Sequence, residues 1–258
     1  MIFETHAHYE DEKFDTDREI LLAQMKEQGI SPIVNVGSSL ETTKKSIQLA
    51  KQYAFIYAAI GIHPCDIADL NEDTIKWLQA HAGDEKVVAI GEIGLDYYWT
   101  KKDYEEQSKQ RYWFGRQLEL ARETGLPVII HSRDAAEDTY QIMAEHHAEE
   151  IGGVVHCFYY SLEMARKFVQ MGFYIGVGGV VTFKNAKKLK EVVINIPLEH
   201  LVLETDCPYM APEPFRGKRN SSLYLPYVVS KIAELKEISE DEVIKVTEKN
   251  ARKMYRLM

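Results

Sequence analysis

Short apolar segments alternate with longer amphipathic, charged segments from one end of the chain to the other. This alternation predicts strands that are each followed by a helix, as in βα units around a parallel sheet. Several apolar segments are almost uninterrupted, as expected for strands that are covered on both faces. We predict eight strands, at residues 2–8, 32–37, 55–63, 87–94, 127–131, 153–156, 173–178 and 201–206.

Amphipathic segments between the predicted strands have the spacing of helices. Clear examples lie at residues 20–28, 105–124, 162–171 and 185–193. Ser239, with Glu242 three residues later, predicts a capping box at the start of a last helix that continues towards Tyr255. The longest irregular segment, residues 208–226, is rich in proline and follows the eighth strand, a position that faces the active site in barrel enzymes.

Eight βα units predict a (β/α)8 TIM barrel, an α/β fold whose typical length is about 250 residues. The chain has 258 residues and shows no internal repeat, low-complexity tract or linker. We therefore expect a single TIM-barrel domain over residues 1–258. A chain of this length can bury a large core without disulfide bonds.

Charge, cysteine content and the first residues narrow the class of protein. Lys and Arg total 31 against 40 Asp and Glu, and the net charge of −9 disfavours a protein that coats nucleic acid by neutralising phosphates. The three cysteines form no C-x-x-C pair, so a disulfide framework is not expected. The N-terminus lacks the pattern of a leader peptide, and no apolar run approaches the ~18 residues of a membrane helix. We expect a soluble cytoplasmic protein that does not bind a membrane.

Histidines and carboxylates gather at the C-terminal ends of the predicted strands, the face on which barrel enzymes carry their active site. Five of the nine histidines lie at such ends. Each of them alone would more often be a hydrogen-bonded core or rim residue, but six ligand-type residues at matching ends predict a metal centre. The six are His6, His8, Glu92, His131, His156 and Asp206.

The spacing of these residues explains how they would share two cations. Side chains alternate along a strand, so His6 and His8 point the same way and can bind one ion together. Glu92 can bridge two ions, which leaves the histidines of strands five and six for the second. Asp206 can bind the first ion and accept a proton from a bridging water. We expect two divalent metal ions, for which Mg, Mn and Zn all fit the ligand types.

Six motifs at strand ends also carry a family resemblance. They are Thr5-His6-Ala7-His8, Gly61-Ile62-His63-Pro64, Gly91-Glu92-Ile93-Gly94-Leu95-Asp96, His131-Ser132-Arg133, His156-Cys157-Phe158 and Thr205-Asp206-Cys207-Pro208-Tyr209. With these motifs the sequence resembles, over essentially its whole length, the TatD family of metal-dependent deoxyribonucleases. The resemblance implies an amidohydrolase-type barrel, a two-metal site formed by the six residues above, and hydrolysis of DNA phosphodiesters, often exonucleolytic.

Two positions depart from the family pattern. Glu4 stands where the family usually has Asp, and on the strand face of His6 and His8 it would either accept hydrogen bonds beside the metal or reach the metal. Arg-Gly-Lys-Arg-Asn is intact at residues 216–220, but Ser221 and Ser222 replace the Glu-Pro that commonly follows. Because of the second departure, the family pattern does not predict the detailed shape of the substrate loop.

Basic residues near strand ends are candidates for binding substrate phosphates. Arg216, Lys218 and Arg219 follow the eighth strand, where barrels commonly bind phosphate, although a solvated basic loop is about equally expected. Arg133 lies two residues after His131, on the same strand face. Arg133 would either contact a substrate phosphate or form an ion pair at the barrel rim.

His63 is expected at the end of the third strand. We favour a catalytic role, in which it hydrogen-bonds a phosphate oxygen or protonates the leaving alkoxide, because a histidine pKa can be tuned near neutrality. A structural role beside Pro64 is the alternative.

Aromatic residues and cysteines near the same strand ends have plainer interpretations. The aromatic side chains could stack on unpaired bases, but packing of loops is the commoner use. They are Tyr97, Tyr98, Trp99, Tyr159 and Tyr160. We expect Cys65, Cys157 and Cys207 to be small packing residues, the latter two facing away from the metal centre while their strands continue.

The predicted function is a divalent-metal-dependent deoxyribonuclease. In this hypothesis a hydroxide that bridges metal ions about 3.5–4 Å apart attacks phosphorus, with Asp206 as general base, Glu92 as bridge and His63 assisting. DNA is the expected partner, as single strands or frayed 3′ ends, because the chain has too little positive charge for a continuous duplex. A monomer is favoured.

Two other classes fit the same residues. A two-metal hydrolase of amide, lactone or ester bonds, including removal of the aminoacyl group from tRNA, would use the same ligands to attack a carbonyl. The absence of a lysine at the end of strand four, where many amidohydrolases carry a carboxylated lysine, and the basic residues 216–219 disfavour it. A non-catalytic binding barrel is less consistent with six retained ligands.

Overall fold

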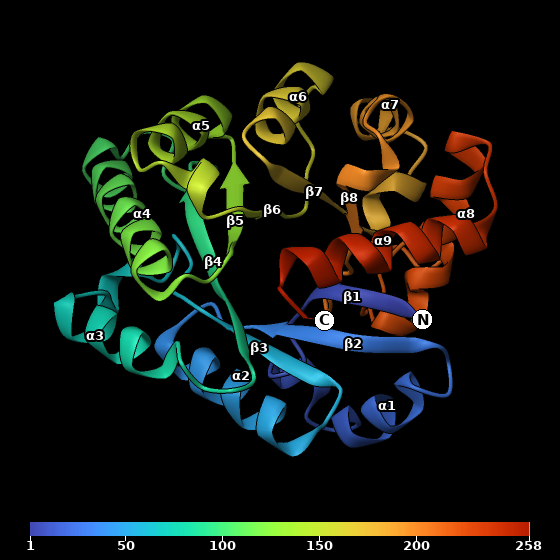
Figure 1. Ribbon diagram of the computed structural model, residues 1–258, viewed down its shortest axis with the longest axis horizontal. Helices are drawn as coiled ribbons and strands as arrows, with labels where there is room; N and C mark the ends of the chain where they lie inside the picture. Colours follow the sequence, from blue (N-terminus) through green and yellow to red (C-terminus); the bar gives the residue numbers. More distant parts are fainter. Residues whose placement is uncertain (258) are drawn as a thin grey trace.

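Eight parallel strands form one sheet in the order β1-β2-β3-β4-β5-β6-β7-β8 in the computed structural model, which describes residues 1–257 and their side chains other than that of Asp69. An isolated bridge between Ala7 and Cys207 connects the two edges, so the sheet curves into a barrel (Figure 1). The strands are β1 (Ile2–Ala7), β2 (Ile30–Val36), β3 (Ile56–Ile60), β4 (Val87–Asp96), β5 (Val128–Arg133), β6 (Gly153–Val155), β7 (Phe173–Val177) and β8 (Leu201–Leu203). The predicted (β/α)8 barrel is confirmed.

A ring of helices surrounds the strands, because each strand is followed by a helix that returns the chain to the start of the next strand (Figure 1). The ring consists of α1 (Arg18–Met25), α2 (Leu40–Gln52), α3 (Glu72–His81), α4 (Tyr104–Thr124), α5 (Ala136–Glu145), α6 (Leu162–Gln170), α7 (Lys187–Asn195) and α8 (Leu225–Lys236). Short 3-10 helices lie at η1 (Glu12–Phe14), η2 (Ile67–Asp69), η3 (Ala148–Glu150), η4 (Gly179–Thr182), η5 (Leu198–His200) and η6 (Ser222–Tyr224). A last helix, α9 (Glu240–Met254), begins after Ser239, whose side chain accepts a hydrogen bond from the backbone N–H of Glu242. This N-cap was predicted.

Six strands, β1, β2, β3, β6, β7 and β8, end one to three residues earlier than predicted. β3, β6 and β8 stop before His63, His156 and Asp206, so these three residues lie in the loops that follow their strands. The backbone explains two of the early ends, because Cys157 and Asp206 have φ angles of 44° and 55°, a left-handed conformation that an extended strand does not contain. The loops still emerge at the C-terminal face of the barrel.

Helix α9 closes the opposite, N-terminal end of the barrel. One apolar cluster combines residues of the strands, such as Phe3 and Ile129, with Tyr255 just after α9. The ring of Tyr255 stacks on Phe3 with centroids 6.0 Å apart, and its hydroxyl donates a hydrogen bond to the backbone oxygen of Thr5. In Figure 1, α9 crosses in front of the strands. A substrate therefore has access to the barrel interior from the C-terminal face.

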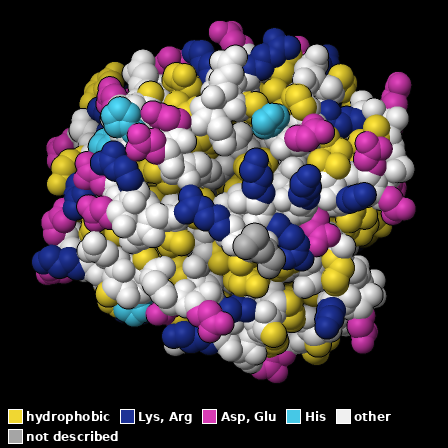
Figure 2. All heavy atoms as spheres, in the orientation of Figure 1, with side chains coloured by type: hydrophobic (Ala, Val, Ile, Leu, Met, Phe, Trp, Pro, Cys, Tyr) yellow, Lys and Arg dark blue, Asp and Glu magenta, His cyan; other side chains and the backbone are white. Residues whose placement is uncertain are grey.

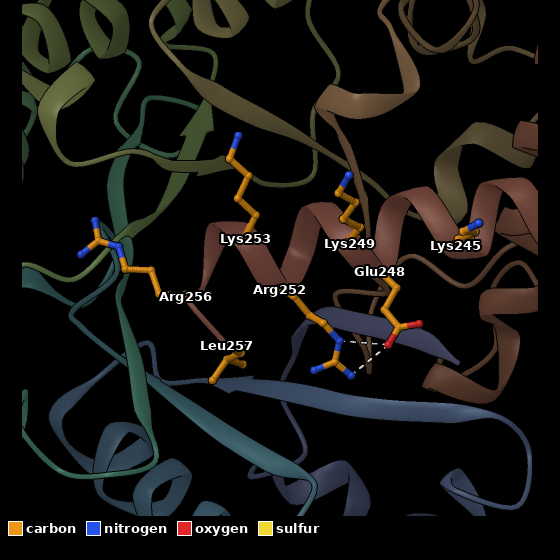
Figure 3. A pocket seen from close by; sticks show the side chains of 7 residues that line it. All are labelled: Lys245, Glu248, Lys249, Arg252, Lys253, Arg256 and Leu257. Carbon is orange, nitrogen blue, oxygen red and sulfur yellow. Dashed lines mark hydrogen bonds and ion pairs between the residues drawn. The ribbon is translucent and has the colours of Figure 1, made fainter.

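The outer surface of α9 is basic although the whole chain is acidic. Lys245, Lys249 and Lys253 are exposed and spaced four residues apart, which places them along one side of the helix. Arg252 instead forms an ion pair with Glu248, and Figure 3 shows it pointing away from Lys249 and Lys253. Lys and Arg side chains gather over α9 in Figure 2 around a shallow hollow of about 710 Å³. This basic surface lies at the barrel end opposite the strand ends that carry His6 and His8.

A helix that crosses a membrane must be both long and apolar. Within residues 1–257, none of the helices combines the length and the apolar content of a membrane span.

Candidate metal centre

A cavity of about 960 Å³ opens at the C-terminal ends of the strands. Its wall contains most of the residues that the sequence assigns to the site: His8, His63, Glu92, His131, Arg133, His156 and Asp206. His6 is fully buried beside them, with its ring stacked on that of His156 at a centroid distance of 4.1 Å. The structure thus brings together all six predicted metal ligands and His63.

Glu92 lies at the centre of the cluster, and its two oxygens face different histidines. Oε1 is 2.7 Å from Nδ1 of His131 and 2.6 Å from Nε2 of His156. Oε2 is 3.5 Å from Nε2 of His6 and 3.7 Å from Nε2 of His8. Burial raises the pKa of the Glu92 carboxyl, but the surrounding histidines outweigh burial and hold that pKa well below its ordinary value. Glu92 is therefore an anion between two pairs of imidazoles.

Hydrogen bonds fix which nitrogen of His8 and of His131 faces the cluster. Nδ1 of His8 donates to the backbone oxygen of Val36 at 2.8 Å, so Nε2 is the nitrogen that faces Asp206. Nε2 of His131 lies 3.2 Å from Oδ2 of Asp96, which leaves Nδ1 to face Glu92. Histidines that bind metals are held in this way, with the second nitrogen donating to a carbonyl or a carboxylate.

The donor set fits a cation. Nε2 of His6 and Nε2 of His8 face each other at 3.0 Å, a distance at which two lone pairs need a proton or a metal ion between them. Burial lowers the pKa of His6 to about 4, so its ring is neutral near pH 7. Burial also lowers the pKa of His131, but Asp96 and Glu92 outweigh burial and raise it to about 9. The cluster therefore stabilises positive charge, and potential ligand atoms within groups such as His6, His8 and Glu92 lie within 4.8 Å of one another.

Asp206 completes one side of the cluster. Its Oδ1 lies 3.6 Å from Nε2 of His6 and 3.4 Å from Nε2 of His8, while its backbone N–H donates to the backbone oxygen of His6. Burial raises the pKa of the Asp206 carboxyl, but His8 and His6 outweigh burial and keep it below its ordinary value. The side chain is 18% exposed, so it contacts both the histidines and the cavity.

His63 faces the other side of Glu92. Burial lowers its pKa to about 3, which makes the ring neutral. Nδ1 accepts a hydrogen bond from the backbone N–H of Cys65 at 3.1 Å, so the proton is on Nε2, which lies 3.7 Å from Oε1 of Glu92. His63 therefore presents an N–H donor to the cavity.

Several carboxylates of the site, among them Glu10, Asp96 and Glu204, were not among the predicted functional residues. Asp96 ends β4 and contacts His131, as described above. Glu204 lines the cavity, accepts a hydrogen bond from the backbone N–H of Cys157 at 2.5 Å, and has a buried Oε2 with no hydrogen-bond partner among residues 1–257. Burial raises the pKa of Glu204 to about 8. The sequence signal was present, since Glu204 stands two residues before Asp206 and Asp96 four residues after Glu92.

The departure at Glu4 has a clear structural role. Its carboxylate does not line the cavity but is fully buried, and its Oε1 accepts hydrogen bonds from the backbone N–H groups of His6 and Thr205. Its Oε2 accepts from Oγ1 of Thr205 and from Oγ of Ser222, each at 2.7 Å. Of the two roles left open by the sequence, the structure supports the hydrogen-bond acceptor. Glu4 thus connects the backbone of β1 with the residue before Asp206.

The predicted phosphate-binding residues are not all at the cavity. Arg133 lines it and stacks on the ring of Tyr98, with its guanidinium carbon 3.8 Å from the ring centroid. The cavity wall does not include Arg216, Lys218 or Arg219. Arg216 packs on Phe183, and Arg219 forms a bidentate ion pair with Asp17. The ion pair gives Arg219 a structural partner in place of a substrate phosphate.

The expectation for the cysteines is wrong in part. Cys65 is exposed and Cys157 half-buried, and both line the cavity, whereas Cys207 is fully buried as predicted for a packing residue. Cys157 turns towards the cavity because the strand ends before it and its backbone is left-handed.

Known proteins resemble this chain in sequence and in fold. A family model described as "TatD related DNase" matches residues 3–256. The chain is 47% identical over 257 residues to the uncharacterized metal-dependent hydrolase YabD of Bacillus subtilis, with 100% of both chains covered. It is 33% identical over 260 residues to the uncharacterized metal-dependent hydrolase YcfH of Escherichia coli, covering 100% of this chain and 96% of YcfH. The crystal structure of YjjV, a TatD homologue from Escherichia coli, superposes with a TM-score of 0.92 at 32% identity, covering 100% of this chain and 98% of YjjV.

Proposed function

The chain belongs to the TatD-related DNase family of metal-dependent hydrolases, and from this premise we propose that it is a divalent-metal-dependent deoxyribonuclease that hydrolyses DNA phosphodiester bonds. The observation that carries the proposal is the position of Glu92, whose two oxygens face two separate pairs of histidines. In this proposal His6, His8 and Asp206 would hold one cation, His131 and His156 would hold the other, and Glu92 would contribute to both. Two bound cations would neutralise the charge that develops on the phosphoryl oxygens.

The side chains of the cavity wall would carry the proton transfers. Asp206, an anion at the cavity wall, is placed to accept the proton of the attacking water. His63 presents its Nε2–H, which can donate to a phosphoryl oxygen or to the leaving alkoxide. Arg133 at the rim offers a forked donor that matches phosphate oxygens.

The shape and charge of the site favour an unpaired strand end over a continuous duplex. The cavity is a hollow of about 960 Å³ whose wall contains Arg133 as its one Lys or Arg among the described side chains. A duplex presents two charged backbones, which need many cationic contacts, whereas a single strand needs fewer. We therefore propose exonucleolytic action on single strands or frayed 3′ ends. The free cysteines are consistent with a reducing cytoplasm, which is the location that we propose.

Turnover of defined oligonucleotides tests the function. The purified chain is incubated with Mg, Mn or Zn and with end-labelled single-stranded DNA, blunt duplex, frayed duplex and RNA of one sequence. We expect shortening of single-stranded and frayed DNA that stops on chelation and is absent from the Glu92→Gln variant. DNA that stays intact under every metal, or a product ladder that is the same for the wild type and Glu92→Gln, would refute the proposal.

One observation favours a second candidate function, hydrolysis of an ester, lactone or amide. Residues 216–219 do not line the cavity, so few Lys or Arg side chains lie near the predicted metal ligands. A neutral carbonyl substrate needs few such cationic contacts. Chromogenic esters and lactones in the same panel separate the candidates. Turnover of these compounds without any cleavage of DNA would select the carbonyl hydrolase.

A further inference from the structure

Exposed aromatic and apolar side chains surround the mouth of the cavity. Five of its lining residues are exposed by 37% to 70%. They are Tyr98, Trp99, Tyr159, Tyr209 and Met210. A single exposed apolar residue is common on any protein, but several around one opening are typical of a surface that contacts a ligand.

Trp99 differs from the other members of this group. Tyr159 donates its hydroxyl to Asp134, and Tyr209 donates its hydroxyl to Asp11. Trp99 is 70% exposed, the largest fraction of the five, and contacts Tyr98 edge to face, with centroids 4.7 Å apart and planes at 88°. The broad indole surface is therefore available to a flat partner.

Asp96 holds this aromatic loop at a fixed place relative to the metal ligands. Its Oδ2 lies 3.2 Å from His131, while its Oδ1 accepts a hydrogen bond from the backbone N–H of Tyr98 at 3.0 Å. Its backbone oxygen accepts from Oγ1 of Thr100, which brackets Trp99 from the other side. The same carboxylate thus orients a histidine of the cluster and the start of the loop that carries Trp99.

Positively charged side chains lie close to these aromatic rings. The guanidinium of Arg133 covers one face of Tyr98 at 3.8 Å and lies 5.8 Å from the centroid of Trp99, and Nζ of Lys101 lies 4.8 Å from the centroid of Tyr98. Aromatic rings interleaved with cations bind a single-stranded nucleic acid, because the bases stack on the rings and the phosphates contact the cations. An isolated phosphate or a small ester would make no use of the exposed indole.

We propose that Trp99, supported by Tyr98, is a stacking subsite for the unpaired base of a nucleotide next to the scissile phosphate, and that Arg133 binds that nucleotide's phosphate. The inference rests on the proposed function and narrows its substrate to nucleic acid with unpaired bases. A base in a duplex is already stacked and paired, so it reaches Trp99 only after the end has frayed. Trp99 is a determinant of substrate preference and takes no part in the chemical step.

Three variants test the subsite. Trp99→Ala removes the ring, Trp99→Phe keeps a smaller ring, and Tyr112→Ala removes an aromatic side chain of α4 that is 56% exposed and does not line the cavity. The probes are one single-stranded oligonucleotide and the same oligonucleotide with abasic nucleotides beside the cleaved bond. Binding is measured in chelator by fluorescence anisotropy, and kcat/KM is measured with Mn.

Stacking on one aromatic side chain corresponds to about a tenfold change in affinity. We expect Trp99→Ala to weaken binding and lower kcat/KM about tenfold on the normal strand, with Trp99→Phe intermediate and Tyr112→Ala unchanged. On the abasic strand the wild type should fall to the level of Trp99→Ala, and Trp99→Ala should fall no further. If wild type cuts DNA and Trp99→Ala matches it on both strands, the subsite is refuted and the nuclease stands. If wild type neither cuts nor binds either strand, the nuclease and the subsite are refuted together.

Discussion

Oγ of Ser222 donates a hydrogen bond of 2.7 Å to Oε2 of Glu4, which joins two positions that we expected to depart from the family pattern. The carboxylate has four donors in all, and two of them are the backbone N–H groups of His6 and Thr205. The same serine oxygen accepts a hydrogen bond from the hydroxyl of Tyr9 at 2.9 Å. Glu4 and Ser222 together form a buried network directly behind the proposed metal ligands His6 and Asp206.

Ser222→Ala should destabilise the protein through this network. The change removes one of the four donors to Glu4 and the serine oxygen that accepts from the Tyr9 hydroxyl, and the loss of such a buried hydrogen bond costs about 1–3 kcal/mol of the free energy of unfolding. Ser230→Ala is the matched control, because its exposed hydroxyl contacts Glu240 on the surface and its loss should cost at most about 0.5 kcal/mol. Urea denaturation of both variants measures the difference. Equal midpoints would show that the network contributes nothing to stability.

Asp206→Asn should reduce the rate more than the metal content. The amide keeps an oxygen that can bind a cation but cannot accept a proton, so kcat should fall by about 10²- to 10⁴-fold. Metal content after gel filtration, measured by mass spectrometry, should fall much less. Asp73→Asn, at a carboxylate that is 90% exposed, should change neither quantity. A variant at position 206 with wild-type turnover would remove Asp206 from the catalytic role.

Arg133→Ala should weaken binding of single-stranded DNA and reduce its dependence on salt. Loss of one phosphate contact lowers the slope of log K against log salt by about 0.7 for a single strand. Lys249→Ala removes the same charge from the basic surface of α9, at the opposite end of the barrel, and should leave kcat/KM unchanged. If the two variants have the same effect, Arg133 acts only through the total charge of the protein.

The double variant Arg216→Ala and Lys218→Ala should reduce the cleavage of long substrates but not of short ones. Both residues lie outside the cavity wall, so they can contact phosphates of a strand that extends beyond the cavity but not a dinucleotide. Arg219 is kept, because its ion pair with Asp17 would make any change ambiguous between binding and folding. Cleavage of a dinucleotide and of a 15-nucleotide strand, compared with the wild type, measures the effect. An equal loss on both lengths would contradict this placement.

Much of the fold and of the metal centre follows from local sequence patterns. Apolar segments of the right length predicted every strand, and the period of two along β1 paired His6 with His8. The ends of β6 and β8 could not be predicted in this way, because they depend on left-handed backbone at Cys157 and Asp206. Neither residue is a glycine, so the sequence carries no direct sign of that conformation.

The contacts of the loop residues near the predicted substrate site were harder to predict, because they join residues that are far apart in the sequence. Arg219 and Asp17 are far apart in the sequence, and their ion pair becomes visible only when the loop after β8 packs beside the loop before α1. The contact between Glu4 and Ser222 likewise joins residues 218 positions apart. Strand ends converge because of the barrel topology, but the partners of a loop residue depend on how the loops fold over the barrel.

Anomalous scattering from crystals grown with Mn is the most direct test of the central claim, that Glu92 is shared by two cations. We predict two peaks about 3.5–4 Å apart, one beside His6, His8 and Asp206 and the other beside His131 and His156, with Glu92 between them. In Glu92→Gln crystals both peaks should weaken, whereas Glu41→Gln, at an exposed carboxylate on α2, should leave them as in the wild type. A single peak, or a pair of peaks that does not respond to Glu92→Gln, would contradict the shared-carboxylate centre.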